Sequence, residues 1–164
     1  MALEIPTTTV CPFCQNVSGQ PVVSRRDGET VGCAVIEATD DTFAFINPRQ
    51  LASPHVLVIP RRHRATMLDL TIDEATSIMR HVHRLARAVF EEFSPSGLNI
   101  YQNNGSAAGQ SVGHVHFHIV PTYAVRPGRF FSTRDLPRTL LAEREALAER
   151  LREALRKSED LGAT

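Results

Sequence analysis

The sequence has no excess of charge of either sign. Its 164 residues include 18 Lys and Arg and 18 Asp and Glu, so the formal net charge is +0. A balanced chain has no general attraction to nucleic acid or to membrane surfaces. We therefore do not expect nucleic acid as a partner, and any phosphate chemistry must use a local site.

Long hydrophobic runs and an export signal are also absent from the sequence. Runs such as residues 56–59, Val-Leu-Val-Ile, are far too short to span a bilayer. Residues 1–6 contain no basic segment followed by an apolar stretch, so we expect no secretory signal peptide. These features predict a cytoplasmic protein that does not enter a membrane.

Cysteine is scarce, with three residues at positions 11, 14 and 33. An odd number of cysteines in a chain without an export signal favours free thiols or a metal site over structural disulfides. Cys33 falls within a predicted strand, where we expect it to be a small buried residue. Cys11 and Cys14 are separated by two residues, a spacing typical of both metal half-sites and redox pairs.

The composition is typical of a globular protein, with 42% hydrophobic and 22% charged residues. No internal repeat or low-complexity linker divides the chain. We expect the main unit in residues 1–125, followed by a C-terminal extension in residues 126–164. This extension carries an amphipathic helix and is expected to be part of the same domain.

The apolar pattern predicts two helices. Thr71 and Glu74 form a capping box, and the apolar residues that follow recur every three or four positions until Pro95 ends the pattern. A second helix is predicted over residues 139–157. Its apolar side would carry Leu140, Leu147, Leu151 and Leu155.

Short runs of β-branched and aromatic residues predict the strands. Residues 1–20 contain several Pro and Gly residues and look irregular. Together with the two helices, the strands predict an α+β fold with a mainly antiparallel sheet. The predicted strands cover residues 30–37, 42–46, 55–59, 98–102 and 114–120, with a hairpin around Asp40 and Asp41.

Three histidines alternate with apolar residues in the last of these strands. His114, His116 and His118 would line one face, roughly 6–7 Å apart, because alternate side chains of a strand share a face. Val115, Phe117 and Ile119 would pack on the helix side. Such a row of imidazoles could hold a metal, or it could provide nitrogen nucleophiles and cationic donors along one groove.

The loop before these histidines favours phosphate chemistry. Residues 103–111 are rich in small side chains, so backbone N–H groups could approach an anion closely. Gln110 and Ser111 add side-chain donors. The loop is not a P-loop, because no Gly-Lys-Ser/Thr follows it.

The segment His-Val-His-Phe-His-Ile-Val, residues 114–120, resembles the alternating motif that defines the histidine triad superfamily. The resemblance extends over about residues 10–123. It implies a HIT-like fold, with a five-stranded antiparallel sheet, one long helix and here a C-terminal helix. Members of this superfamily usually pair as symmetric homodimers, so we expect a homodimer.

The resemblance also implies an activity. It indicates a nucleotidyl hydrolase or transferase that acts on the α-phosphate of a nucleoside phosphoramidate or a dinucleoside polyphosphate, with a purine nucleotide as substrate. His116 would be the nucleophile and would form a nucleotidyl-histidine intermediate, which requires no catalytic metal. The alternative is a nucleotide-binding regulatory protein with vestigial activity.

The same resemblance assigns roles to further residues. His118 would contact the reacting phosphate, His55 would support the triad, and His114 completes it as its first member. Asn47 would hold the ribose hydroxyls, and Asn103 would lie near the phosphates. The expected phosphate-binding loop residues are Gly109, Gln110 and Ser111.

Cys11-Pro-Phe-Cys14 has three interpretations. A redox pair would need its first thiol at a helix N-terminus after a strand, and residues 15–21 are poor helix sequence. A bare thiol pair is a second possibility. The third is a structural zinc site, because relatives within the superfamily complete this half-site with two histidines that match His63 and His114.

The remaining basic residues have simpler interpretations. His81 and His83 flank the apolar stripe of the long helix, and we expect both to be solvated. The basic run over residues 61–64 is typical of a solvated loop.

Overall fold

The protein folds around one antiparallel sheet. The computed structural model describes residues 3–24, 27–124, 133 and 135–162, so the expected boundary between residues 125 and 126 lies outside the described residues. In chain order the elements are α1 (Pro12–Ser18), β1 (Val22–Val23), β2 (Thr30–Val31), β3 (Val35–Ala38), β4 (Thr42–Ile46), β5 (Val56–Pro60), the 3-10 helix η1 (Met67–Asp69), α2 (Ile72–Phe93), β6 (Gly97–Gln102), the 3-10 helix η2 (Ser106–Ala108), β7 (Phe117–Thr122) and α3 (Leu141–Gly162).

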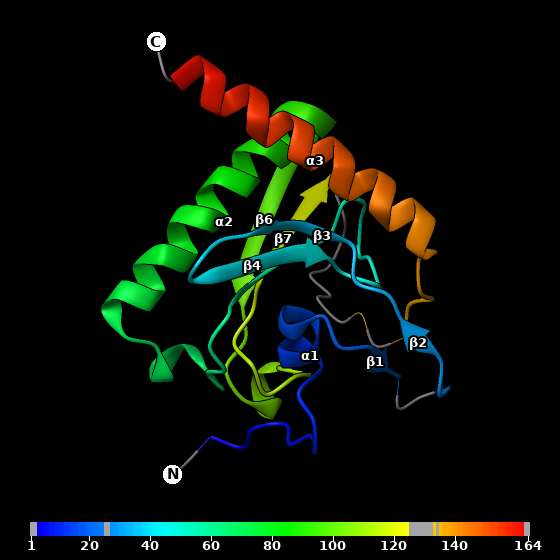
Figure 1. Ribbon diagram of the computed structural model, residues 1–164, viewed down its shortest axis with the longest axis vertical. Helices are drawn as coiled ribbons and strands as arrows, with labels where there is room; N and C mark the ends of the chain where they lie inside the picture. The colour runs from blue at the N-terminus through cyan, green and yellow to red at the C-terminus, as the bar shows by residue number, and fades with distance from the viewer. Residues whose placement is uncertain (1–2, 25–26, 125–132, 134, 163–164) are drawn as a thin grey trace.

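The sheet has five strands in the order β3-β4-β5-β7-β6, and every neighbouring pair is antiparallel (Figure 1). The predicted α+β fold with a five-stranded antiparallel sheet, a long helix and a C-terminal helix is confirmed. β1 and β2 form a separate two-stranded sheet. β7 therefore lies between β5 and β6, where a side chain on either face has neighbours from both adjacent strands.

The long helix α2 begins as its sequence predicts. The Thr71 side chain accepts a hydrogen bond from the Glu74 N–H at 3.2 Å, and a Glu74 oxygen accepts one from the Thr71 N–H at 2.9 Å. This reciprocal pair satisfies two N–H groups that the first turn of a helix otherwise leaves unpaired. The apolar stripe of the helix is buried at Ile78, Val82, Leu85 and Val89.

The two faces of the sheet have different surroundings. On one face, Ala44, Ile46, Val56 and Val58 belong to a core shared with α2 and α3. On the other face, a second cluster gathers Phe43, Phe45, Leu57 and Ile59 around Phe13 of α1. Phe117 and Ile119 of β7 join the helix-side core as predicted, which directs His118 to the other face.

Helix α3 packs against α2 and β3 (Figure 1). Leu151 and Leu155 are buried as predicted, whereas Leu140 is 68% exposed and precedes the helix. Arg144 is also buried, and its Nη1 donates to the Gly32 carbonyl at 2.6 Å. The extension is thus attached to the sheet by polar as well as apolar contacts.

Two expectations for the N-terminal half are wrong. Residues 1–20 include the helix α1, which has Cys11 at its N-cap, Pro12 in its first turn and Gly19 as a left-handed C-cap with φ of 71°. Proline fits the first turn and glycine the left-handed cap, so these two residues favour a short helix here. Residues 30–37 form two strands instead of one, and Cys33 lies half-buried between them, where burial raises its pKa to about 12.

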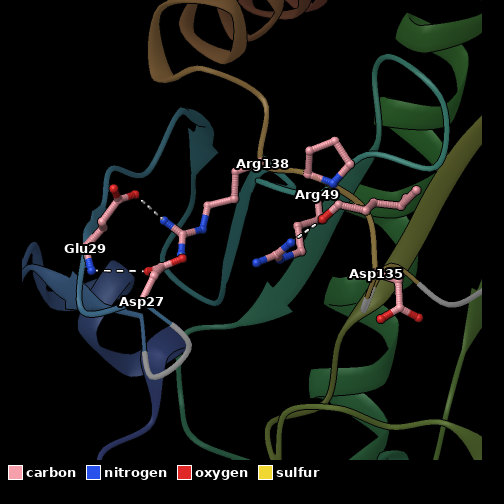
Figure 2. A pocket seen from close by; sticks show the side chains of 7 residues that line it. Asp27, Glu29, Arg49, Asp135 and Arg138 are labelled. Carbon is pink, nitrogen blue, oxygen red and sulfur yellow. Dashed lines mark hydrogen bonds and ion pairs between the residues drawn. The ribbon is translucent and has the colours of Figure 1, made fainter.

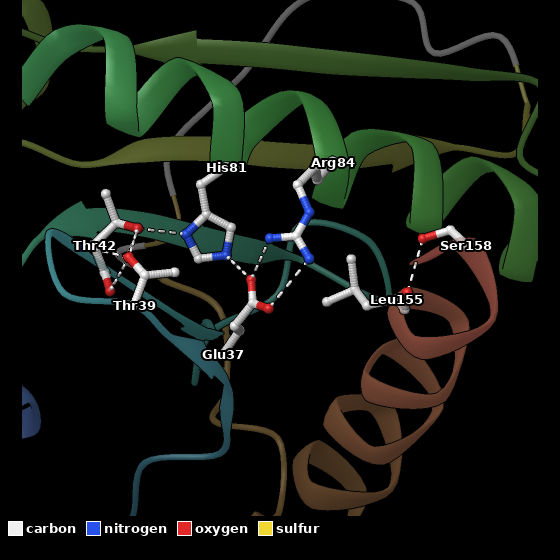
Figure 3. A network of polar contacts seen from close by, with 7 residues as sticks. All are labelled: Glu37, Thr39, Thr42, His81, Arg84, Leu155 and Ser158. Atoms are coloured by element: carbon white, nitrogen blue, oxygen red, sulfur yellow. Dashed lines mark hydrogen bonds and ion pairs between the residues drawn. The ribbon is translucent and has the colours of Figure 1, made fainter. Parts of the chain in front are cut away.

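The prediction that His81 is solvated is also wrong, because its ring is buried between α2 and the sheet (Figure 3). Its Nδ1 lies 2.7 Å from the Thr42 hydroxyl, and its Nε2 lies 2.8 Å from a Glu37 carboxylate oxygen. Arg84 donates to both oxygens of the same carboxylate at 3.1 and 3.3 Å. The hydrogen bonds and charges of His81 and Arg84 hold the pKa of Glu37 below its ordinary value. His83 is exposed as predicted.

Within the part of the chain that the structure describes, we find no helix that is both long enough and apolar enough to cross a membrane.

Candidate active site

The three histidines of the motif do not lie on one strand. Strand β7 begins at Phe117, so it contains His118, while His114 and His116 precede it after a bend at residues 112–114. Gly113 allows the N-terminal segment to pack closely against this bend, because a Cβ there would lie 2.3 Å from the Pro6 carbonyl oxygen. The expectation that one strand carries all three histidines is therefore wrong, although Val115, Phe117 and Ile119 alternate into the helix-side core as predicted. His116 and His118 lie side by side with ring centroids 4.9 Å apart, and His114 faces the cysteines.

His118 is held between residues of both adjacent strands. It pairs in register with Leu57 of β5 and with Tyr101 of β6. The Tyr101 ring stacks on the His118 ring, with centroids 4.3 Å apart and planes 9° apart. Sequence reasoning missed Tyr101. The sequence does place Tyr101 in a predicted strand, which is β6 in the structure. Its pairing with His118 depends on the register between β6 and β7, which the sequence does not specify.

The contacts of His55 favour one arrangement of protons in the His55–His118 pair. The Leu51 N–H donates to His55 Nδ1 at 3.4 Å, which favours the neutral His55 ring with its proton on Nε2. His55 Nε2 lies 2.9 Å from His118 Nδ1 and donates to it. The proton of neutral His118 is therefore on Nε2, which makes that atom a hydrogen-bond donor.

Burial keeps both rings of this pair uncharged. It lowers the pKa of His55 to about 3, helped by the charge of His116, and the pKa of His118 to about 2, helped by His116 and His55. Both rings are therefore neutral at pH 7, and their tautomers are set by hydrogen bonds alone.

His116 has the opposite tautomer. Its Nδ1 donates to the His114 carbonyl oxygen at 2.7 Å, so its Nε2 carries a free lone pair in the neutral ring. Burial lowers the pKa of His116 and favours this neutral form. The Phe13 ring packs edge-on against it, with centroids 5.2 Å apart. A neutral imidazole oriented in this way is suited to nucleophilic attack through Nε2.

Asn47 follows β4 and lies against the His55 ring. Its Nδ2 is 3.4 Å from both ring nitrogens of His55, and its Oδ1 accepts the Arg49 N–H at 3.0 Å. Asn103 lies at the other end of the site, where its side-chain nitrogen approaches Gly109. The structure thus brings Asn47 to the histidines and Asn103 to the loop that precedes them.

The loop over residues 103–111 is held together from within. The Gln110 side chain is buried, accepts the Gly105 N–H at 2.7 Å and donates to the Ala65 and Val112 carbonyls at 2.7 and 3.0 Å. The Gly109 N–H donates to the Ser106 carbonyl, and Gly109 has φ of 87°, which favours glycine. In this conformation Gln110 stabilises the loop, while the Ser111 side chain is exposed.

The four predicted zinc ligands come together. His114 Nδ1 lies 3.5 Å from Cys11 Sγ and 3.6 Å from Cys14 Sγ, and His63 Nδ1 lies 3.4 Å from Cys14 Sγ. All four donor atoms lie within 4.8 Å of one another. Zinc bonds of about 2.0–2.3 Å in a tetrahedron place neighbouring ligand atoms roughly 3.3–3.8 Å apart, so this donor set fits the metal.

The tautomer of His114 also suits a metal. Its Nε2 donates to the Pro60 carbonyl oxygen at 3.0 Å, which leaves the Nδ1 lone pair directed at the thiols. Phe13, between the two cysteines, lies 5.8 Å from the His114 ring and also touches His116. The candidate metal site and the candidate nucleophile therefore share a residue and a backbone segment.

A separate pocket lies between the β1–β2 connection and residues 135–138 (Figure 2). Asp27 and Glu29 pair there with Arg138, Arg49 donates to the Leu136 carbonyl, and Asp135 also lines the pocket. None of the predicted catalytic residues lines this pocket, so the histidine cluster is the stronger candidate site.

The chain is similar in sequence to known proteins and in fold to solved structures. The chain is 33% identical to adenosine 5'-monophosphoramidase of Schizosaccharomyces pombe over 111 aligned residues. This alignment covers 68% of this chain and 73% of that protein. The chain is also 37% identical to the asymmetrical bis(5'-nucleosyl)-tetraphosphatase of the same organism over 115 aligned residues. This alignment covers 70% of this chain and 61% of that protein.

A solved structure extends the similarity to most of the chain. A Zn-bound histidine triad family protein from Mycobacterium smegmatis superposes with a TM-score of 0.71 at 28% identity, over 92% of this chain and 96% of that one. Residues 29–125 match the HIT domain family. The chain therefore belongs to the HIT domain family, the family of histidine triad proteins.

Proposed function

We propose that this protein is a nucleotidyl hydrolase or transferase that attacks the α-phosphorus of a purine nucleotide with His116 Nε2. The observation that carries the proposal is the hydrogen bond from His116 Nδ1 to the His114 carbonyl, which leaves Nε2 free. The neighbouring His118 supplies an N–H donor on the same face, with ring centroids 4.9 Å apart. A nucleophile and an adjacent donor are the groups that a two-step phosphoryl displacement needs.

In the first step the Nε2 lone pair of His116 forms a bond to the α-phosphorus. The phosphoramidate P–N bond, or the anhydride P–O bond, breaks, and the leaving group takes the bonding electron pair. A leaving amine also takes up one proton from solvent. The positive charge that develops on His116 is stabilised because its Nδ1–H remains bonded to the His114 carbonyl. In the second step water forms a bond to phosphorus and the bond between phosphorus and His116 Nε2 breaks, with its electron pair returning to Nε2. The nucleoside monophosphate is released with one proton, and His116 is neutral again.

The other predicted residues serve binding in this scheme. The His118 Nε2–H donates to a phosphate oxygen as charge builds up, and the exposed Ser111 hydroxyl is available to the same group. Asn47 binds the ribose hydroxyls, and Asn103 and Gly109 approach the phosphates. Gln110 contributes by holding the loop, because its amide is already bonded within it.

The substrate class follows from the relatives. One is an adenosine 5'-monophosphoramidase and another a dinucleoside tetraphosphatase, which supports a nucleoside phosphoramidate or a dinucleoside polyphosphate as substrate. A regulatory nucleotide-binding role with vestigial activity is the alternative, and the turnover experiment below separates the two. A homodimer and a cytoplasmic location stay predictions.

We propose that Cys11, Cys14, His63 and His114 hold a structural zinc ion, as a zinc-bound relative with the same fold supports. When bound, zinc would supply a fixed tetrahedral link between four protein ligands and no reactive position. The ligands come from α1, from the loop after β5 and from the segment before β7, so their role is to hold the His114 carbonyl in place beside His116.

The test is turnover of adenosine 5'-phosphoramidate, diadenosine tri- and tetraphosphate and adenosine 5'-phosphosulfate, with product analysis by chromatography. Protein denatured at alkaline pH during turnover, where a histidine P–N bond survives, should gain the mass of one nucleotidyl group. His116→Ala should lose both turnover and adduct by several orders of magnitude, while His83→Ala, which removes an exposed histidine of α2, should match wild type. No turnover by wild type, or more than about a tenth of it in His116→Ala, would overturn the proposal.

A further inference from the structure

The segment that links β7 to α3 contacts the loop that carries His55. The HIT domain match ends at residue 125, so residues 136–139 lie beyond it. The Thr139 N–H donates to the Pro48 carbonyl at 2.9 Å, and Arg49 Nη1 donates to the Leu136 carbonyl (Figure 2). The C-terminal extension therefore rests directly on the connection between β4 and β5.

One side chain joins this contact to the catalytic face. Gln50 Nε2 donates to the Thr139 hydroxyl at 3.2 Å, and Gln50 Oε1 accepts the backbone N–H of His55 at 3.1 Å. Because an amide is planar, fixing its nitrogen also fixes its oxygen. The Thr139 hydroxyl therefore holds the acceptor that binds the His55 backbone.

The position of the His55 backbone matters because its ring sets the tautomer of His118. The Asn47 N–H donates to the His55 carbonyl at 2.8 Å, and the Leu51 N–H donates to His55 Nδ1 at 3.4 Å. The closed loop over residues 47–55 thus directs His55 Nε2–H at His118 Nδ1, 2.9 Å away. If the loop opened, His118 would lose the partner that keeps its proton on Nε2.

We infer that the C-terminal extension is a working part of the active site, with Thr139 and Gln50 as positioning residues for the His55–His118 pair. Thr139 orients the Gln50 amide, Gln50 fixes the His55 backbone, and His55 holds the His118 Nε2–H toward the substrate. The part of this inference that concerns turnover rests on the proposed function. The part that concerns the His118 tautomer does not.

The Thr139 hydroxyl is not needed to attach the extension. Arg138 pairs with Asp27 and Glu29 and donates to the Ser24 hydroxyl at 2.7 Å. Arg144 donates to the Gly32 carbonyl at 2.6 Å, further along the extension. Loss of the Thr139 hydroxyl should therefore leave the extension in place while releasing the Gln50 amide.

The kinetic test compares Thr139→Val, which keeps the shape of the side chain but removes its hydroxyl, with Thr139→Ser, which keeps the hydroxyl. We expect Gln50→Ala and Thr139→Val to lower kcat about tenfold with KM nearly unchanged, because small misplacements of a catalytic group are costly in rate. Thr139→Ser should restore kcat. Arg150→Gln is the matched control, since it removes the contact of α3 with Glu92 and touches no part of the 47–55 loop.

The spectroscopic test needs no substrate. In ¹⁵N-labelled wild-type protein, His118 should show an unprotonated Nδ1 and a protonated Nε2, and in Thr139→Val these ¹⁵N shifts should move toward the average of the two tautomers. This shift, with normal shifts in Thr139→Ser and Arg150→Gln, supports the inference even if no tested nucleotide is turned over. Unchanged His118 shifts in both Gln50→Ala and Thr139→Val, or a kcat loss no larger than that of Arg150→Gln, would overturn it.

Discussion

Glu37 gives the sharpest stability prediction, because its carboxylate joins α2 to the edge of the sheet. Glu37→Gln keeps the shape of the side chain but replaces one acceptor oxygen with an N–H₂ donor. In the wild-type protein the Glu37 carboxylate binds the His81 ring, whose side chain is 3% exposed. It also binds the Arg84 guanidinium, whose side chain is 37% exposed. The substitution therefore weakens contacts to a deeply buried partner and to a half-buried one.

The magnitude follows from these contacts. A hydrogen bond to a charged group contributes about 1.5–3 kcal/mol to the free energy of unfolding. Solvent screens the partly exposed Arg84, so its bonds to Glu37 contribute less than that. Because glutamine retains one acceptor oxygen, we expect Glu37→Gln to lower the free energy of unfolding by about 2 kcal/mol. For a chain of this size, that corresponds to a fall in melting temperature of about 4–8 °C.

The assay is urea unfolding followed by circular dichroism, with Glu91→Gln as the matched control. Glu91 pairs with Arg87 on α2 at 3.1 Å, but their side chains are 51% and 66% exposed, so the expected loss is about 0.3–0.5 kcal/mol. The same unfolding curves at lower pH test the charge. The pKa of Glu37 is lower in the folded protein than its ordinary 4.5, so its contribution is present above pH 4.5 and is lost as pH falls through the folded pKa.

Two results would refute this reasoning. If Glu37→Gln destabilised the protein no more than Glu91→Gln at pH 7, the carboxylate would not link α2 to the sheet. If the difference between wild type and Glu37→Gln stayed constant from pH 7 to below pH 4, the charge of the carboxylate would not be the cause.

Three further predictions concern the site. His118→Ala should lower kcat about 100-fold with a smaller effect on KM, since its donor acts on charge that develops in the transition state; an unchanged kcat with a raised KM would assign it to ground-state binding. Phe13→Leu should destabilise the protein by about 1–2 kcal/mol and lower kcat, because the Phe13 ring packs on both His116 and Phe45; a normal kcat at reduced stability would separate α1 from catalysis. The protein as purified should hold about one zinc per chain, and a chelator should lower its melting temperature but not that of Cys11→Ser/Cys14→Ser; a wild type whose melting ignores chelator and added zinc would eliminate the metal site.

Features set by local sequence could be predicted well. The capping box of Thr71 and Glu74 depends on residues three apart, and the structure has it as expected. The alternation of Phe117, His118 and Ile119 follows from the geometry of a strand, and it correctly separates the helix-side core from the face that carries His118. The structure brings together the four candidate metal ligands that the family resemblance implies, a long-range grouping that spacing alone does not indicate.

Features set by distant partners could not be predicted. His81 lies beside the apolar stripe of α2, so its own helix does not show that Glu37 and Thr42 approach it from the sheet. The bend before β7 brings Gly113 close to Pro6, a contact between residues more than a hundred positions apart. The sequence does not indicate that the Gln110 amide donates to Ala65 in the segment after β5, and the phosphate-binding role that the resemblance implies for Gln110 stays a prediction.

The distinct chemistry of the three motif histidines also depends on such partners. In the sequence they are equivalent, because each alternates with an apolar residue. In the structure His114 Nε2 donates to the Pro60 carbonyl, and His116 Nδ1 donates to the His114 carbonyl. His118 Nδ1 accepts a hydrogen bond from His55. The first ring is left with a lone pair facing the thiols, the second with a lone pair on Nε2, and the third with an N–H donor. The three histidines are thus suited to metal binding, nucleophilic attack and hydrogen-bond donation. In each case the ring nitrogen that a neighbouring group already binds decides which of these the ring can do.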